Sequence, residues 1–484
     1  MNRPLACIFV SLALASAAAA KDFVGVYEDA LKSDPQIHQA EANRRASREA
    51  RPQAWSALLP QVNGTLARTQ DKQDGSEPSQ NIGTSSGTPG NPQGPVQPGT
   101  GGAPSSEFLV DSISKTWSLN LRESLFSWAN WMSVRQADKE VAQAEATYLA
   151  AEQNLILRVA QAYFNVLSAL DGLEANQASL EAISRQLDQA NKRFEVGLIA
   201  ITDVQEAKAA RDTAAAAVIA GKRTLATAGD QLSEITGQKY DSLNKPGDDM
   251  PLNNPEPAEE DRWVTISLDQ NPSLLSSRLA ADIARENVRI AFGGHLPTLD
   301  LLASKSRTTS DANETFAGTP FGVNTAVNDR QYTLQVTVPL FSGGLTQSRV
   351  RQAQYQWIAA KEGVVQSSRA TERQARDAYL GVISGIARVQ ALRQALESSQ
   401  TALKATEAGY EVGTRTAVDV LNSRRTLVQA QTDYAGSRYD YIVSIIQLRL
   451  AAGNLSQNDV TEINKWLGVS ASTIPSQVTA PPQP

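Results

Sequence analysis

Residues 193–204 read RFEVGLIAITDV, and residues 409–420 repeat this stretch in altered form as GYEVGTRTAVDV. The two copies lie 216 positions apart, and the same offset places Ala162-Tyr163 over Ala378-Tyr379. Repeated segments in the same order indicate a structure that stacks or closes by symmetry. The sequence therefore predicts an internal duplication. Such a duplication is evidence for the architecture of the protein rather than for a catalytic pocket.

Differences in local composition divide the chain into further segments. Residues 1–20 have a basic residue, an apolar run and small residues before Lys21, which is typical of a cleaved signal peptide. We expect a first structural repeat at 21–250, built of a helix, two strands and a long helical hairpin, and a second repeat at 251–466. Residues 70–107 are rich in Gly, Ser, Pro and Gln and predict a flexible extracellular loop, while residues 467–484 predict a disordered C-terminal tail.

Charge and composition exclude several classes of function. The net charge of -6 lacks the excess of positive charge that is typical of nucleic-acid-binding proteins. The cysteine lies inside the signal segment and the chain has two histidines, His38 and His295, so we expect no metal site and no cofactor. Beyond the signal segment no apolar run reaches about 18 residues, so we expect no transmembrane helix; strands of a transmembrane β-barrel need about 9 to 11 residues, and they stay possible.

Four segments alternate apolar and polar residues, which is the pattern of β-strands. They are residues 61–69, 117–122, 298–304 and 332–338. These segments predict two hairpins with long loops, the second of them at 311–329. Four strands are too few to close a barrel in lipid, so several chains would have to share one barrel. A soluble β-sandwich is the alternative.

Large aromatic side chains cluster at the helix-proximal ends of these strands. They are Trp55, Trp128, Trp131 and Phe341. An aromatic girdle at a membrane interface has this placement, whereas tryptophans of a soluble core would be more scattered.

Two very long helices dominate the rest of the chain. Residues 133–195 and 352–407 are nearly free of Gly and Pro, and small apolar residues recur at 3-4 spacing, as in a coiled-coil seam. Val-Gly pairs at 196–197 and 412–413 predict the ends of these helices, because glycine fits the left-handed residue after a helix C-terminus. Second helices starting near Thr202 and Thr416 would complete two hairpins. We also expect shorter helices at 34–57, 261–268, 271–293 and 460–467.

The segments quoted above resemble those of one family, the outer-membrane efflux proteins or outer membrane factors. The resemblance runs from about Phe23 to Trp466 and includes residues 293–301, which read GGHLPTLDL. It implies an α+β membrane protein, a homotrimer with a 12-stranded outer-membrane β-barrel continuous with a 12-helix periplasmic α-barrel. Each chain would supply four strands and its long coiled-coil-like helices. The implied function is a passive exit duct, closed at its periplasmic end, for multidrug efflux, type I protein secretion or both.

The resemblance also implies a gate at the periplasmic end of the helices. Arg415 would bind Thr202, Tyr410 would bind Asp203, and Gln186 would bind Glu407. The residues alone favour a simpler interpretation, in which Asp203 and Asp419 stabilise the first turns of their helices. Thr416 and Asp419 also match a capping box. The predicted gate network is Gln186, Thr202, Asp203, Glu407, Tyr410 and Arg415.

Two further sites are carried over by the resemblance. Asp419 would line the narrowest part of the pore, where Asn422 replaces the second acidic residue of the family pattern and leaves ion selectivity open. The direction of the neighbouring Arg424 and Arg425 is not decided by the sequence. Contacts to the adaptor would come from the tip residues Val196, Gly197, Leu198, Val412, Gly413 and Thr414.

The implied partners are two further copies of the chain, a periplasmic adaptor, an inner-membrane transporter (ABC or proton-driven) and outer-membrane lipid. A duct needs no nucleophile, metal or cofactor, and we expect no enzyme. The alternative from another class is a structural coiled-coil spacer or adhesin of the cell envelope, although strands at one end of tandem helical hairpins argue against a plain spacer.

Overall fold

The computed structural model describes residues 20–78, 105–247, 249–316 and 319–474. Contacts divide the chain into two compact units. The strand unit comprises the described residues of 49–138 and 284–357, and the helical unit comprises those of 1–48, 139–283 and 358–484. The predicted signal peptide, apart from Ala20, the centre of the predicted 70–107 loop and the end of the predicted tail lie outside the described residues.

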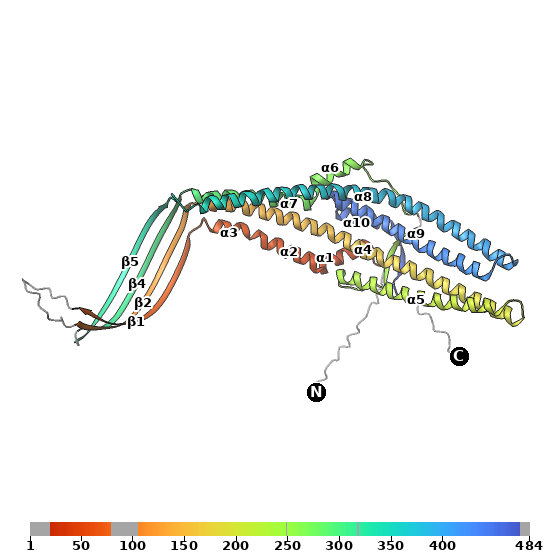
Figure 1. The fold of residues 1–484 in the computed structure, drawn as a ribbon, viewed down its shortest axis with the longest axis horizontal. Helices are drawn as coiled ribbons and strands as arrows, with labels where there is room; N and C mark the ends of the chain where they lie inside the picture. Colours follow the sequence, from red (N-terminus) through yellow and green to blue (C-terminus); the bar gives the residue numbers. More distant parts are fainter. Residues whose placement is uncertain (1–19, 79–104, 248, 317–318, 475–484) are drawn as a thin grey trace, which may run out of the picture. The chain divides into compact units, whose positions relative to one another are not determined.

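Four long strands of the described chain form an antiparallel sheet in the strand unit (Figure 1). They are β1 (Gln61–Pro78), β2 (Ser105–Phe126), β4 (Thr298–Phe316) and β5 (Thr319–Thr337). Their order is β1-β2-β4-β5, so the two hairpins meet where β2 pairs with β4. The predicted strands are therefore present, but they have 18, 22, 19 and 19 residues, which is about two to four times the expected lengths.

Two of the predicted loops are corrected by these strands. Residues 70–78 and 105–107 belong to β1 and β2, which leaves 79–104 outside the described residues, and most of the predicted loop at 311–329 is strand. Polar side chains of the predicted 70–107 loop make contacts across the strands. The Gln70 amide donates to Asp111 at 3.2 Å, and the Lys72 ammonium lies 3.2 Å from the same carboxylate. Cross-strand polar and charged pairs stabilise an antiparallel sheet, so polar composition alone was misleading here.

The strand unit also holds short helical segments next to the sheet, α3 (Ala50–Ser56) and the 3₁₀ turn η1 (Gly293–His295). A Cβ at Gly293 would lie 3.0 Å from the backbone nitrogen of Ala129 and 3.2 Å from the Trp128 ring. Glycine is thus required where this turn meets the start of the long helix α4 (Trp128–Glu195).

Two helical hairpins are the main feature of the chain (Figure 1). The first joins α4 (Trp128–Glu195) to α5 (Ile201–Thr236), and the second joins α8 (Leu345–Glu411) to α9 (Ala417–Ala452). Both α4 and α8 begin earlier than predicted. Their ends agree with the prediction, because Gly197 and Gly413 adopt φ values of 77° and 79° at the turns.

The core of the helical unit is built around aromatic side chains from three helices. Phe23 of α1 (Phe23–Ser33) contacts Tyr163 and Phe164 of α4, and Phe164 stacks on Tyr439 of α9 at 5.8 Å between ring centroids. Neither α1 nor the two-stranded sheet of β3 (Ser242–Pro246) and β6 (Leu467–Ser472) was expected. β6 also corrects the predicted disordered tail, because residues 467–472 are a strand.

Two shorter helices begin at equivalent polar residues. Asp34 accepts a hydrogen bond from the Ile37 backbone at the start of α2 (Pro35–Arg48), and Asn271 accepts bonds from Ser273 and Leu274 at the start of α7 (Pro272–Phe292). Such side chains satisfy the free N–H groups of a first helical turn. Asp34 is buried and forms an ion pair with Arg158 of α4 at 2.5 Å. The predicted short helices at 261–268 and 460–467 correspond to α6 (Glu260–Gln270) and α10 (Gln457–Asn464).

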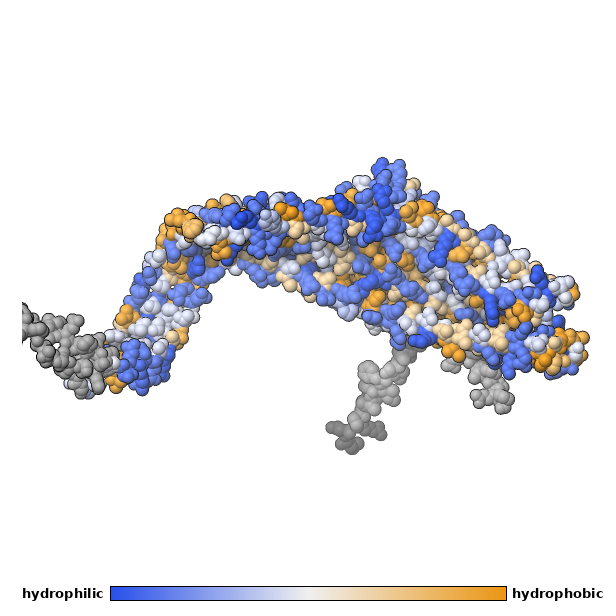
Figure 2. Space-filling view, in the orientation of Figure 1, coloured by the Kyte–Doolittle hydropathy of each residue, from blue (hydrophilic) through white to orange (hydrophobic). Residues whose placement is uncertain are grey.

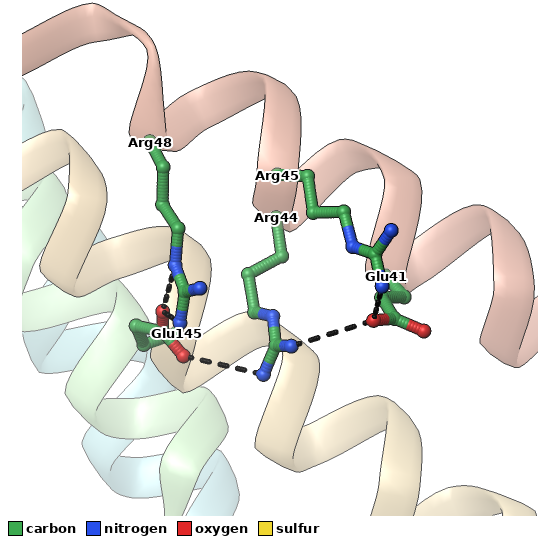
Figure 3. A network of polar contacts seen from close by, with 5 residues as sticks. All are labelled: Glu41, Arg44, Arg45, Arg48 and Glu145. Atoms are coloured by element: carbon green, nitrogen blue, oxygen red, sulfur yellow. Dashed lines mark hydrogen bonds and ion pairs between the residues drawn. The ribbon is translucent and has the colours of Figure 1, made fainter. Parts of the chain in front are cut away.

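An ion-pair network holds α2 against α4 (Figure 3). Glu145 of α4 binds Arg48 at 2.5 Å and Arg44 at 3.6 Å, and Glu41 binds Arg45 at 2.5 Å. The Arg44 guanidinium also lies over the Tyr148 ring, 4.1 Å from its centroid. Within the described part of the chain, no helix is both long enough and apolar enough to cross a membrane.

Candidate functional site

The turns of the two hairpins expose apolar side chains (Figure 2). Val196, Leu198 and Val412 are 69%, 73% and 76% exposed. Below the first turn, Ala190, Val204 and Ala207 form a small buried cluster, so the turn is supported by packing while its tip residues are not. An unpacked apolar tip on a supported turn is suited to binding another protein.

Backbone geometry explains the glycine in each turn. The backbone N–H of Leu198 donates to the Arg193 carbonyl at 2.9 Å, and that of Thr414 donates to the Gly409 carbonyl at 2.8 Å. These bonds close the helix ends around Gly197 and Gly413, where a Cβ would meet no atom within 4 Å. Glycine is needed for its positive φ here, and the space beside it stays open.

The predicted gate residues lie near these turns, in contacts that differ from the expected ones. The Arg193 guanidinium lies over the Tyr410 ring, 5.3 Å from its centroid, and joins α4 to α8. Glu407 forms an ion pair with Arg424 of α9. The side-chain oxygen of Gln186 is buried and has no hydrogen-bond partner among the described residues.

The three expected gate contacts are not formed within a single chain. Among the described residues, no hydrogen bond or ion pair joins Arg415 to Thr202, Tyr410 to Asp203, or Gln186 to Glu407. Arg415 instead packs its aliphatic stem next to Gly409, where a Cβ would lie 2.8 Å from the arginine Cγ. Contacts made with another copy of the chain stay predictions.

Asp419 forms the capping box that the sequence predicted. Its carboxylate accepts the Thr416 backbone N–H at 2.9 Å and the Thr416 hydroxyl at 3.0 Å, and its own backbone N–H donates to that hydroxyl at 3.2 Å. The bonds from Thr416 lower the pKa of Asp419, and the charge of Arg415 adds to the effect. The carboxylate is therefore ionised at neutral pH and fixed against the first turn of α9.

The structure decides the directions of the two arginines that follow. Arg424 points to α8, where it meets Glu407, while Arg425 and Asn422 are exposed. The two arginines are adjacent in sequence, so the helix turns them about 100° apart.

A polar cluster that sequence reasoning missed joins α4, β3 and α9. The Tyr439 hydroxyl donates to Asp171 at 2.6 Å, and the Lys245 ammonium lies 3.2 Å from the other oxygen of Asp171. Arg438 donates to the carbonyl of Pro246 at 3.2 Å. Burial, together with the negative charge of Asp171, raises the pKa of Tyr439 far above its ordinary value. No motif signals this cluster; the nearest clue is the pair Gly172 and Gly436, small residues on the facing helices.

The predicted girdle aromatics gather in the strand unit. Trp55 and Trp131 meet edge to face at 6.0 Å, and both are substantially exposed. The Trp128 indole donates to the Arg289 carbonyl at 3.1 Å, and Phe341 is 90% exposed just after β5. Among residues 20–78, 105–247, 249–316 and 319–474, no group of three or more His, Cys, Asp or Glu side chains is placed to hold a metal ion.

Comparison with known proteins identifies relatives over nearly the whole chain. Residues 26–238 and 263–454 match the family model described as outer membrane efflux protein. The outer membrane protein TolC of Vibrio cholerae is 35% identical, over 96% of this chain and 98% of that protein. TolC of Escherichia coli is 34% identical, over 99% of this chain and 92% of that protein. The alkaline protease secretion protein AprF of Pseudomonas aeruginosa is 27% identical, over 90% and 85% of the two chains.

Solved structures share the fold at lower sequence identity. A structure of CusC, described in connection with transmembrane channel formation, matches with a TM-score of 0.70 at 17% identity, over 90% of this chain and 92% of that chain. The outer membrane protein VceC of Vibrio cholerae matches with a TM-score of 0.66 at 19% identity, over 89% and 96%. The arrangement of long helical hairpins and strands is therefore common to these chains.

Proposed function

The chain belongs to the outer membrane efflux protein family, and we infer that it is an outer-membrane channel that extends into the periplasm. It serves as the exit duct of multidrug efflux, type I protein secretion or both. The observation that carries this inference is the identity of about a third to TolC proteins over nearly the full length of both chains. The relative named for protease secretion supports the secretion role. These relatives are channel and secretion proteins, and we assign no catalysis to the chain.

The edges of the sheet support a homotrimer. β1 and β5 each pair on one side within the described chain, and an open strand edge is prohibitive in lipid. Tyr332, Leu334 and Val336 alternate along β5 and are exposed, as lipid-facing residues are. Three chains with four strands each would close a 12-stranded barrel, and their hairpins would form a 12-helix α-barrel.

The same proposal covers the organisation of the chain. Residues 1–20 are a signal peptide that is removed on export, and an ancestral duplication produced the repeats 21–250 and 251–466. The similar lengths of α4 and α8, 68 and 67 residues, and of α5 and α9, 36 residues each, support this origin. Trp55, Trp128, Trp131 and Phe341 would anchor the trimer at the lipid interface.

We assign the gate to contacts between hairpins of neighbouring copies. Tyr410, Asp203, Arg415 and Thr202 lie at the hairpin ends, and Asp203 and Arg415 have no ion-pair partner among the described residues. Two of these side chains are therefore available for pairing across chains. Asp419 and Asn422 would line the constriction. The exposed tips around Val196 and Val412 would receive a periplasmic adaptor, which links the duct to an inner-membrane ABC or proton-driven transporter.

Complementation tests this function directly. The full-length chain is expressed in a Gram-negative strain that lacks its own efflux duct and carries matching adaptors and transporters. We expect restored resistance to exported drugs or restored secretion of a type I substrate. The matched control, Val196→Asp with Leu198→Asp, alters only exposed tip residues, so it is expected to reach the outer membrane without restoring export. A wild-type chain that reaches the outer membrane as a trimer and restores neither activity, with adaptors and transporters from its own host also supplied, would contradict the proposal.

A further inference from the structure

A cavity of about 600 Å³ lies inside the helical unit, away from the hairpin tips. It is bounded by residues 253–258, by Trp263 of α6, by α9 and by α10. Small-molecule sites in proteins have volumes of about 300–1,000 Å³ and combine apolar walls with a few polar groups. The size of this cavity fits a small organic molecule.

Two aromatic side chains of the cavity wall already have hydrogen-bond partners within the protein. The Trp263 indole donates to the Pro257 carbonyl at 2.8 Å. The Tyr441 hydroxyl donates to the Asn253 carbonyl at 3.0 Å and accepts the Asn253 backbone N–H at 2.9 Å. These bonds fix residues 253–258 to the helices, and the aromatic rings are left as apolar surface. Trp466, which is partly exposed, completes the aromatic wall.

The charges around the cavity are unbalanced. Arg449 is bound to Asp459 at 2.9 Å, and the second oxygen of Asp459 accepts the Ser456 backbone N–H at 2.8 Å. This pair is neutral as a whole. Glu256 and Glu462 also line the cavity and are exposed, and neither side-chain carboxylate has a hydrogen-bond or ion-pair partner among the described residues. The neighbouring surface of α6 is strongly hydrophilic (Figure 2). The mouth of the cavity therefore carries two unpaired negative charges above apolar walls.

We propose that this cavity binds a small organic cation, with an ammonium or amidinium group on an apolar or aromatic body. The cationic group lies between Glu256 and Glu462, and the body lies against Trp466. Charge-assisted hydrogen bonds to carboxylates are stronger than neutral ones, and a cation beside an indole face gains further attraction. The carboxylates disfavour anions and favour a cation over a neutral ligand of the same shape. A bound cation would tie residues 253–258 more firmly to α9 and α10.

A pair of nearly isosteric probes tests the charge requirement. 4-Phenylbenzamidine carries a positive amidinium group, and 4-phenylbenzamide is its neutral counterpart. Each is titrated into the purified mature protein in detergent, and binding is measured by isothermal titration calorimetry and tryptophan fluorescence. We expect one saturable site per chain for the amidine and at least about tenfold weaker binding of the amide, which corresponds to about 1.4 kcal/mol.

Matched variants locate the site. Glu256→Gln and Glu462→Gln are each expected to weaken amidine binding about tenfold, and Trp466→Phe to remove most of the fluorescence change. Glu259→Gln is the control, because Glu259 directly follows residues 253–258, does not line the cavity and pairs with Arg262. Circular dichroism melting checks that every variant is folded. Equal binding of the two probes, equal effects of all three glutamine variants, or no amidine binding at millimolar concentration would each overturn the proposal.

Discussion

Glu407 of α8 and Arg424 of α9 form an ion pair that joins the two helices of the second hairpin. Beside it, the Ser423 hydroxyl donates to the Thr406 hydroxyl at 3.2 Å. These two contacts join α8 to α9 a short distance from the turn of the hairpin. Glu407 was expected to bind Gln186, so any such contact between chains has to compete with Arg424.

Loss of this ion pair is expected to loosen the end of the hairpin without unfolding it. Arg424→Gln removes a partly exposed pair, which contributes about 0–1 kcal/mol to stability. We predict faster hydrogen exchange in residues 404–426, measured by mass spectrometry, and a nearly unchanged melting temperature. Arg425→Gln is the control, because Arg425 is exposed and points about 100° away from Arg424 around α9. Equal exchange in the two variants would show that the pair does not brace the hairpin.

Two glycines with the same backbone conformation are expected to differ in their tolerance of alanine. Gly453 and Gly413 have φ values of 77° and 79°. The left-handed conformation costs alanine about 1–2 kcal/mol at either position. At Gly453, however, the new Cβ would lie 2.5 Å from the Cα of Asn271, whereas at Gly413 it meets nothing within 4 Å.

Thermal unfolding therefore distinguishes the two positions. We expect Gly413→Ala to show only the backbone strain and Gly453→Ala to be clearly less stable or to fail to assemble. Similar melting temperatures for both variants would mean that the junction between α9 and α7 is looser than the structure shows.

Ionisation of Tyr439 is expected to lower the stability of the folded protein at alkaline pH. Burial and Asp171 raise the pKa of Tyr439 in the folded protein above the ordinary value of 10.0. Its contribution to stability is therefore fully present below pH 10 and is lost as the pH rises above 10. Tyr439→Phe is expected to be about 1–2 kcal/mol less stable at pH 7, because the hydrogen bond to Asp171 is lost.

The slope of the unfolding free energy against pH separates the titration of Tyr439 from the loss of its hydrogen bond. Between pH 9 and pH 11 the wild type is predicted to lose stability more steeply than Tyr439→Phe. Other buried tyrosines, such as Tyr163, titrate in both proteins and cancel in the comparison. Parallel slopes would place the Tyr439 hydroxyl in contact with water.

The contribution of Asp419 to stability is expected to be lost at acidic pH. Its pKa is lowered in the folded chain because Thr416 donates to the carboxylate. The stabilisation is present above the unfolded pKa of about 3.9 and is lost as the pH falls through the folded pKa. We predict that Asp419→Asn melts at a lower temperature than the wild type at pH 7 and that the difference shrinks towards pH 3. A difference that does not change with pH would exclude the ionised capping box as its cause.

The hairpins were predictable from sequence because their signals are local. The Val-Gly pairs mark the turns at Gly197 and Gly413, and Thr416 with Asp419 marks the start of α9. The full length of the strands was hidden, because Gln70 and Lys72 are polar residues that contact Asp111 only across strands. Composition describes such residues as loop, whereas the sheet pairs their polar groups.

Long-range contacts were beyond sequence reasoning. Asp171 and Tyr439 are 268 positions apart, and nothing in either segment identifies the other as its partner. The helix α1 was missed because its position depends on burying Phe23 against Tyr163 and Phe164. The expected gate pairs, carried over from the family resemblance, are not formed within the described single chain, and a test of the gate needs the assembled protein.

Single-channel conductance of the purified mature trimer in a planar lipid bilayer tests the central claim most directly. The wild type is compared with the double variant Tyr410→Phe, Arg415→Ser. A gated duct predicts a small, steady conductance for the wild type and a clearly larger one for the variant, because the contacts that hold the periplasmic end closed are weakened. No conductance from well-folded, inserted trimers of either protein would contradict the duct and favour a structural role in the cell envelope.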